Sequence, residues 1–233
     1  MMARNTRATL LLLTAFLLAA AVAAAQAPPA AGGGTHDARV FREARGVGAD
    51  AARLPEAFEF ELSGYSYRVG NNGSGRRTKD GKTRLFNLRL DGPDFIERIY
   101  FDEYEGNVIL ACEVSDGDAG AGLVLRLEQP SMRARWRRAV PTFNVGPPAR
   151  DGAGLYLTAL NFVARLDLDS GRYVWRLRDL NAPEGPGRGE HFYSFAAPEF
   201  AGDEVLFREA GRYNRPLRTL RVNKKTGRLV GVE

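Results

Sequence analysis

Short runs of hydrophobic residues, some alternating with polar residues and some continuous, recur along the chain from about residue 58. Such runs, bounded by Gly, Asn and Asp, are typical of β-strands. Strands are therefore expected at FEFEL (58–62), YSYRV (65–69), NVILACEV (107–114), GLYLTALNFV (154–163) and EVLFRE (204–209). YSYRV alternates out of phase with FEFEL, which predicts a bulge at Gly64. NNGSGRRTKDGK (71–82) is interpreted as a long polar tip, after which RLFNLRL (84–90) returns.

A polar turn followed by a strand recurs at similar spacing. The copies are LRLEQPSMRARW, ending at Trp136, ARLDLDSGRYVW, ending at Trp175, and LRVNKKTGRLVG, ending at Gly231, with a weaker copy, LRLDGPDFIERI, ending at Ile99. An aliphatic residue stands nine positions before each end, at Leu90, Leu127, Leu166 and Val222. Leu127 and Leu166 are 39 residues apart, close to the ~40 residues of a four-stranded propeller blade. Leu166 and Val222 are 56 apart, which predicts a similar unit with an extra loop.

The copy at Trp175 shows what such a turn needs. Gly171, like Gly227 in the last copy, is expected to supply the positive φ of a hairpin turn. Trp175 is expected to pack between adjacent sheets, where a large ring fills a wide space. Asp167 and Asp169 are expected on one face of the strand, opposite Leu166. These carboxylates are also candidate calcium ligands, although a turn alone explains them.

The pattern L-D-x-x-[ST]-G-[KR]-x-x-W resembles the repeat of pyrroloquinoline-quinone-type (PQQ-like) β-propellers. It is carried by Leu166, Asp167, Ser170, Gly171, Arg172 and Trp175. The last copy replaces the Trp with Gly231, and the copy at Trp136 has Met132 where the Gly would stand. The resemblance covers roughly residues 85–233. It implies an all-β fold, a β-propeller-like stack of about three to four antiparallel blades. Such a partial or small propeller is closed, open, or completed by a second chain.

The N-terminus has the three parts of a secretory signal peptide. Arg4 and Arg7 precede an apolar run at residues 8–25, and small residues offer cleavage near Ala25. The predicted organisation is a signal peptide at 1–25, a flexible leader at 26–57, at most weakly helical after residue 40, and a PQQ-like β-repeat domain at 58–233. The rival interpretation is a retained membrane anchor. Cleavage predicts a periplasmic or secreted protein with no stable membrane span.

Composition and motifs exclude several chemistries. The formal net charge of +5 falls to +3 without residues 1–25, a mild excess, and export argues against nucleic-acid binding. Cys112 is the one cysteine and is expected to be buried and unreactive. The two histidines, His36 and His191, form no H-E-x-x-H motif, and no G-x-S-x-G occurs. Neither a metal site nor a cofactor nor a set of catalytic residues is predicted.

Two segments are candidates for binding. In RARWRR (133–138), Arg133, Arg135 and Arg137 are expected to share one strand face with Trp136 on the other; a solvated face is the alternative to an anion site. The long loop NAPEGPGRGEHFYSF (181–195) mixes charge with aromatics, as binding loops do. Its candidate binding residues are Arg188, Glu190, His191, Phe192 and Tyr193.

These observations combine into one interpretation of function. The chain is expected to be an exported, non-catalytic, β-propeller-like binding or scaffold protein of the bacterial cell envelope, with protein partners there or self-association. Two alternatives stay open. The resemblance raises a quinoprotein-type enzyme or enzyme fragment that binds PQQ and calcium, and the 181–195 loop raises a small-molecule or glycan binder.

Overall fold

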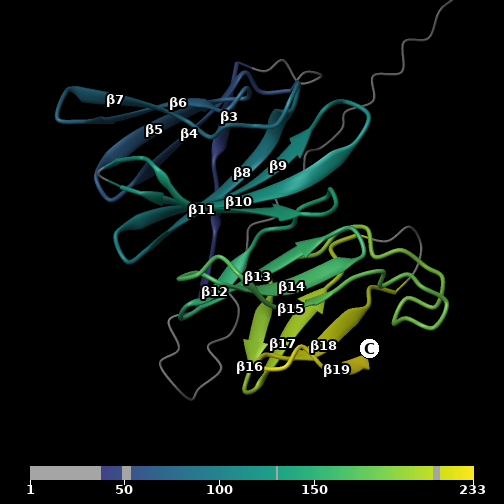
Figure 1. The fold of residues 1–233 in the computed structure, drawn as a ribbon. Helices are drawn as coiled ribbons and strands as arrows, with labels where there is room; N and C mark the ends of the chain where they lie inside the picture. The colour runs from purple at the N-terminus through teal and green to yellow at the C-terminus, as the bar shows by residue number, and fades with distance from the viewer. Residues whose placement is uncertain (1–37, 49–53, 130, 212–215) are drawn as a thin grey trace, which may run out of the picture. The chain divides into compact units, whose positions relative to one another are not determined.

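The computed structural model describes residues 38–48, 54–129, 131–211 and 216–233 (Figure 1). This part of the chain contains 19 β-strands and no α-helix, so the predicted all-β class is confirmed. No helix there is long and apolar enough to cross a membrane. The predicted signal peptide, His36 and the leader up to residue 37 lie outside the described residues.

Sixteen of the strands form four antiparallel meanders that follow one another along the chain. Each meander has four consecutive strands, the unit of a propeller blade. The first sheet contains β4 (Ala57–Leu62), β5 (Tyr65–Gly70), β6 (Ser74–Lys79) and β7 (Lys82–Asn87). The second contains β8 (Phe95–Tyr104), β9 (Asn107–Ser115), β10 (Gly120–Glu128) and β11 (Ala134–Val140). The third contains β12 (Ala149–Asp151), β13 (Gly154–Ala159), β14 (Phe162–Asp167) and β15 (Tyr173–Leu177). The fourth contains β16 (Glu199–Ala201), β17 (Glu204–Arg208), β18 (Thr219–Asn223) and β19 (Leu229–Val232).

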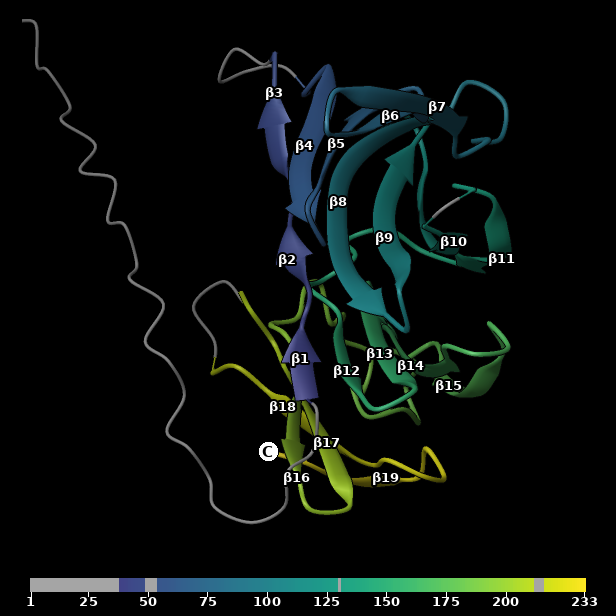
Figure 2. The same ribbon diagram turned by 90° about the vertical axis from the view of Figure 1, so that its left-hand side faces the viewer.

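The remaining three strands come from the N-terminal segment Ala38–Val47, which we call the strap. β1 (Ala38–Val40) pairs with β12, β2 (Arg42–Glu43) pairs with β8, and β3 (Arg45–Val47) pairs with β4. The strap thus extends three successive sheets at the edge formed by the first strand of each meander (Figure 2). The prediction of a flexible, weakly helical leader as far as residue 57 is wrong for the strap. Backbone groups on three open sheet edges supply partners that its own sequence does not reveal.

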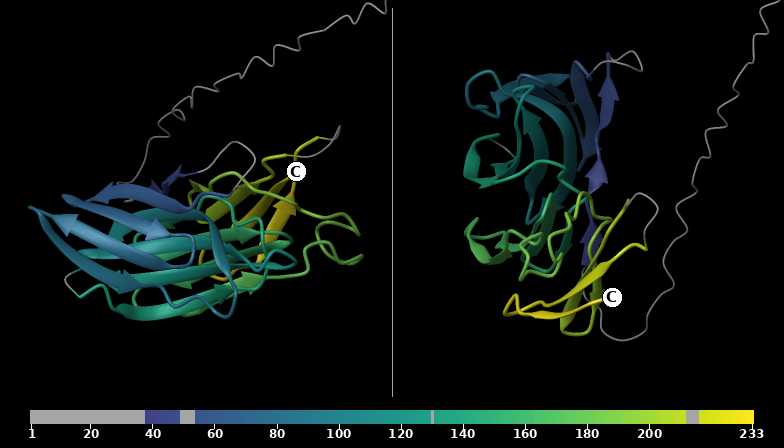
Figure 3. Two further views of the ribbon diagram at one scale, coloured as in Figure 1. Left: turned by 90° about the horizontal axis from the view of Figure 1, so that it is seen from above. Right: turned by 90° about the vertical axis from the view of Figure 1, so that its right-hand side faces the viewer.

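Three hydrophobic clusters join neighbouring sheets in order. One cluster lies between the first and second sheets, with Phe60, Ile99 and Leu125 among its members. The next lies between the second and third sheets, and the last between the third and fourth. Among the described residues no buried hydrophobic cluster joins the fourth sheet to the first, and Figure 3 shows these two sheets at opposite ends of the row. The molecule is therefore a β-propeller-like stack of four blades.

The two outward faces of the row carry ion pairs. On the first sheet, Glu59 accepts hydrogen bonds from Arg45 at 2.8 Å and from Arg68 at 2.5 Å. On the fourth sheet, Arg221 pairs with Glu204 at 2.9 Å and with Glu233 at 2.8 Å. Polar terminal faces of this kind let a row of repeats end in water.

Three local predictions about the first sheet are wrong. Ser63 and Gly64, with φ of 52° and 74°, form a two-residue hairpin turn, and the pairing of β4 with β5 runs on without a bulge. The polar tip predicted at 71–82 contains all of β6, because an outer hairpin with water on its sides needs little hydrophobic alternation. The weak repeat copy ending at Ile99 spans the connection from β7 to β8 rather than a hairpin.

Candidate functional site: a basic groove between the first and second sheets

The turns of the third and fourth sheets are built alike, atom for atom. Asp167 Oδ1 accepts hydrogen bonds from the backbone N–H and the hydroxyl of Ser170, at 2.8 and 2.6 Å. Asn223 Oδ1 accepts the equivalent bonds from Thr226, at 3.0 and 2.9 Å. The bonds from Ser170 lower the pKa of Asp167. Gly171 and Gly227 close the two turns with φ of 66° and 73°, as predicted.

A tryptophan from the preceding sheet packs against each of these turns. The indole N–H of Trp136 donates to the carbonyl of Leu168 at 2.9 Å, and that of Trp175 donates to the carbonyl of Lys224 at 2.8 Å. A Cβ added at Gly171 or at Gly227 would lie 2.5 Å from a ring carbon of the covering indole. The predicted packing of Trp175 between adjacent sheets is therefore confirmed. The glycines are needed for close approach as well as for positive φ.

The corresponding turn of the second sheet lacks this tryptophan. Its two ends match those of the other turns, since Met132 N–H donates to the carbonyl of Glu128 at 2.6 Å and Met132 has a φ of 54°. The carbonyl of Gln129 accepts a hydrogen bond from the guanidinium of Arg77 on β6, where the other turns accept an indole N–H. The chain has only two tryptophans, and both donate hydrogen bonds to the turns of the third and fourth sheets. The junction between the first and second sheets is thus closed differently from the next two.

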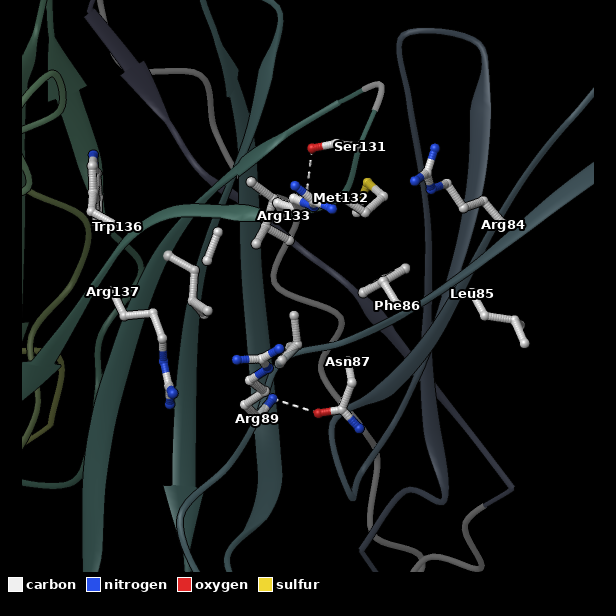
Figure 4. A pocket seen from close by; sticks show the side chains of 14 residues that line it. Arg84, Leu85, Phe86, Asn87, Arg89, Ser131, Met132, Arg133, Trp136 and Arg137 are labelled. Carbon is white, nitrogen blue, oxygen red and sulfur yellow. Dashed lines mark hydrogen bonds between the residues drawn. The ribbon is translucent and has the colours of Figure 1, made fainter.

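A groove of about 740 Å³ lies at this first junction, and we call it the basic groove. One side is formed by β7 and the residues after it, and the other by the β10–β11 hairpin (Figure 4). The lining residues are Arg84, Leu85, Phe86, Asn87, Leu88, Arg89, Leu125, Leu127, Ser131, Met132, Arg133, Ala134, Trp136 and Arg137. Its volume lies within the ~300–1,000 Å³ range of ligand-binding pockets.

Four of the lining residues are arginines and none is acidic. Arg84 and Arg89 come from the first sheet's side, and Arg133 and Arg137 from the second's (Figure 4). Within the described part of the chain, no carboxylate pairs with the guanidinium of Arg89, Arg133 or Arg137. Guanidinium groups bind carboxylates and phosphates through paired, charge-assisted hydrogen bonds. The arrangement is suited to holding an anion.

The floor of the basic groove is apolar. Leu125, Leu127 and Met132 are at most 5% exposed and belong to the core between the first two sheets, and Phe86 packs against that core. A ligand seated here would meet hydrocarbon below and positive charge around it. The chemistry selects molecules with an anionic part and an apolar part.

The residues that line the groove agree with only part of the prediction for RARWRR. Trp136 pairs with Arg126 and Ala134 pairs with Leu127, so a β-bulge leaves Arg135 without a cross-strand partner. Arg133 and Arg137 line the groove, but Arg135 does not. The prediction that Arg133, Arg135 and Arg137 share a face is therefore wrong for Arg135, because the bulge interrupts the alternation.

The 181–195 loop has a different character from the one predicted. Phe192 is fully buried in the core between the third and fourth sheets, beneath the Arg218 guanidinium at 3.6 Å from the ring centre. The prediction that Phe192 contacts a ligand at the surface is wrong, since the ring packs inward. Arg218 also binds the buried Glu209 at 2.9 Å and donates to the carbonyl of His191 at 2.8 Å. These contacts anchor the end of the loop to the fourth sheet.

The other four predicted loop residues lie outside the core. Tyr193 is 56% exposed, and its ring centre lies 5.4 Å from that of His191. His191 Nδ1 lies 2.7 Å from the amide nitrogen of Asn161. Glu190 lies 3.7 Å from Arg218, and Arg188 occupies a turn with a φ of 49°. None of these residues lines the basic groove.

The acidic residues of LDLDSG have structural partners. Asp169 Oδ1 accepts a hydrogen bond at 3.1 Å from Arg126, which is 1% exposed and also pairs with Glu105 at 2.9 Å. Asp169 thus links the third sheet to the second, while Asp167 stabilises its own turn. Among the described residues no group of three or more His, Cys, Asp or Glu is placed to hold a metal ion.

Comparisons with known proteins add no family. No protein-family model and no curated protein sequence matched the chain. Among solved structures, the quinohemoprotein alcohol dehydrogenase ADHIIG from Pseudomonas putida HK5 is 15% identical with a TM-score of 0.49, over 84% of this chain and 36% of that one. The WD40 domain of SCAP from fission yeast is 9% identical with a TM-score of 0.39, over 83% of this chain and 48% of that one. A bifunctional GH43-CE protein of Bacteroides eggerthii is 13% identical with a TM-score of 0.33, over 78% of this chain and 28% of that one. The chain thus spans less than half of each of these structures.

Proposed function

We propose that the protein is an exported, non-catalytic binding or scaffold protein of the bacterial cell envelope, and that the basic groove is its ligand site. The observation that carries the proposal is the set of four arginines above an apolar floor, with no acidic residue in the lining. Buried apolar surface supplies affinity, and a few placed charges supply orientation and selectivity. The ligand is therefore an anion with an apolar portion.

The position of the strap supports this choice of site. In a complete ring of blades, the first strands of the meanders surround a central channel that can hold a ligand. Here β1, β2 and β3 cover that edge on three of the four sheets. The basic groove lies at the opposite edge of the first two sheets, next to their last strands β7 and β11.

A titration with dodecyl phosphate, followed by isothermal calorimetry, tests the groove as an anion site. We expect saturable binding to the wild-type protein, and binding at least tenfold weaker in the double variant Arg133→Gln/Arg137→Gln. Each lost charge-assisted hydrogen bond removes about 1.5–3 kcal/mol. Arg135→Gln is the matched control, because it removes the same charge from the same hairpin outside the groove. Equal weakening in the control, or no binding at all, would contradict the proposal.

Export is tested separately. The apolar run at residues 8–25 and the small residues before Gln26 support cleavage near Ala25. We expect the protein to appear in the periplasmic or extracellular fraction of an expressing bacterium, with an intact mass that starts at about Gln26. Full-length protein in the cytoplasmic fraction would contradict this part of the proposal.

A further inference from the structure

The basic groove runs beside a sheet edge that is open to another strand. β7 is the last strand of the first sheet and pairs only with β6, so its other edge has unpaired backbone groups. Five of its six residues are exposed, and it contains no proline. A long, exposed edge without proline can accept a further strand.

The side chains of β7 divide between two faces. Arg84 pairs across the strands with Arg77, and Phe86 pairs with Gly75; both side chains belong to the face toward the second sheet. Leu85 belongs to the opposite face and is 77% exposed, the highest value among the large exposed hydrophobic residues that the structure describes. An added strand would place alternate side chains beside the arginines and beside Leu85.

Positive charge is spread along the groove rather than gathered at one point. Arg133 and Arg137 lie on one side of the groove, one before and one after the bulge at Arg135, and Arg84 and Arg89 lie on the other side. A single small anion would reach only some of them. An extended chain with acidic residues at alternate positions would meet several.

The same charges discourage pairing between copies of this protein. If two β7 edges met, Lys82 and Arg84 of one copy would lie close to the same two cations of the other, and like charges close together destabilise a pair of strands. An acidic strand meets no such repulsion. The edge therefore selects its partner by charge.

We infer that the basic groove takes an extended acidic segment of a partner polypeptide, which adds a strand to β7 and alternates acidic with apolar side chains. This inference rests on the proposed function and narrows its ligand to a peptide. The acidic side chains bind the groove arginines, and the apolar side chains on the other face cover Leu85. Backbone hydrogen bonds to β7 supply the rest of the affinity.

Fluorescence anisotropy with a labelled eight-residue peptide of alternating glutamate and valine tests the inference. We expect binding by the full mature chain that weakens at least tenfold in Arg137→Gln and at least threefold in Leu85→Ser. Arg135→Gln and Val174→Ser are matched controls and should change binding less than twofold. Val174 is a 47% exposed residue on β15, the last strand of the third sheet. Retained melting temperatures check that the variants fold.

Two further peptides, methylated on alternate backbone nitrogens in opposite phase, test strand addition itself. Only one set of N–H groups in an added strand faces β7, so one methylated peptide should lose at least tenfold in affinity and the other should bind nearly normally. Equal binding by both would overturn strand addition. Arginine-dependent binding of dodecyl phosphate without binding of the peptide would overturn the inference and leave the proposed function standing. Failure of both ligands would overturn both.

Discussion

Gly171 meets two separate requirements at one position. Its φ of 66° lies in the left-handed region, and the indole of Trp136 covers the place where a side chain would begin. Gly227 and Trp175 repeat the pair at the next junction. The turn pattern in the sequence predicts both glycines, but the contact with tryptophan depends on how neighbouring sheets pack.

Gly171→Ala is expected to lower the free energy of unfolding by about 2–5 kcal/mol. The left-handed conformation costs about 1–2 kcal/mol for a residue with a Cβ, and the clash with Trp136 adds about 1–3 kcal/mol of overpacking. Gly152 has a similar φ of 58° with no atom within 4 Å of an added Cβ. Gly152→Ala should therefore cost only the conformational part, about 1–2 kcal/mol. Urea denaturation of the two variants measures the difference, and equal losses would show that the indole contact contributes nothing.

Cys112 is fully buried in β9, as the sequence predicted, and burial raises the pKa of its thiol from 9.0 to about 12. Below pH 9 the thiol keeps its proton in both the folded and unfolded states. Between about pH 9 and pH 12 the unfolded chain loses that proton more readily, so stability falls as the pH rises, by at most about 1.4 kcal/mol per pH unit. Cys112→Ala should make this fall shallower. Urea denaturation from pH 8 to pH 11 is the measurement, and an unchanged slope would contradict the assignment.

At the scale of strands, the strap shows where sequence patterns lose their information. Its strands have three, two and three residues, too few to display a period of two. Its buried anchors are Phe41 and Ala44, which lie between strands and three positions apart, a spacing typical of a helix rather than of a strand. Its structure comes from partners located 10 to 113 residues later in the chain, which no local pattern contains.

Phe41→Ala is expected to destabilise the protein by about 3–5 kcal/mol, the usual cost of deleting a buried aromatic ring. Phe41 is 3% exposed in the cluster between the second and third sheets, and its N–H donates to the carbonyl of Pro148 at 2.9 Å. Val40, the preceding residue, is 53% exposed. Val40→Ala should change stability by about 0.5 kcal/mol or less. Guanidinium denaturation of both variants checks this, and a small loss for Phe41→Ala would mean that the strap is not anchored there.

The basic groove illustrates a second kind of missing information. Its two sides come from residues 84–89 and 125–137, which are adjacent only because neighbouring sheets pack together. The pattern of RARWRR predicts arginines on one side, but the bulge at Arg135 leaves only Arg133 and Arg137 of the predicted three lining the groove. The composition of the 181–195 loop predicts a binding surface, yet one of its aromatic residues, Phe192, is buried in the core. Strands and turns were predictable from local pattern, whereas sites formed between sheets were not.

At the scale of the whole molecule, the row of four sheets ends in two polar faces. Ion pairs of Glu59 on the first sheet and Arg221 on the fourth occupy positions that a further blade would have to cover. Burying such pairs against another chain would cost desolvation that only well-matched partners repay. The outward faces therefore favour water over a neighbouring copy.

We expect the mature protein, residues 26–233, to be a monomer in light scattering at micromolar concentration. Pairing of two copies into one ring would have to cover both polar faces, and the electrostatic cost opposes it. A concentration-independent mass near that of one chain supports this expectation. A stable dimer would contradict it, and Arg221→Ala would then show whether the fourth sheet's face forms the contact.

The pairing of the strap also determines the order in which strands can form during folding. Ala38 lies near the start of the chain, yet it pairs with Asp151, 113 residues later. During synthesis, residues 38–47 emerge before any of the sheet edges with which they pair. The first two sheets can form from consecutive hairpins, but β1 must wait until β12 has appeared. The strap residues are thus synthesised first and are among the last to pair, and an unfinished chain leaves them available to chaperones and to proteases.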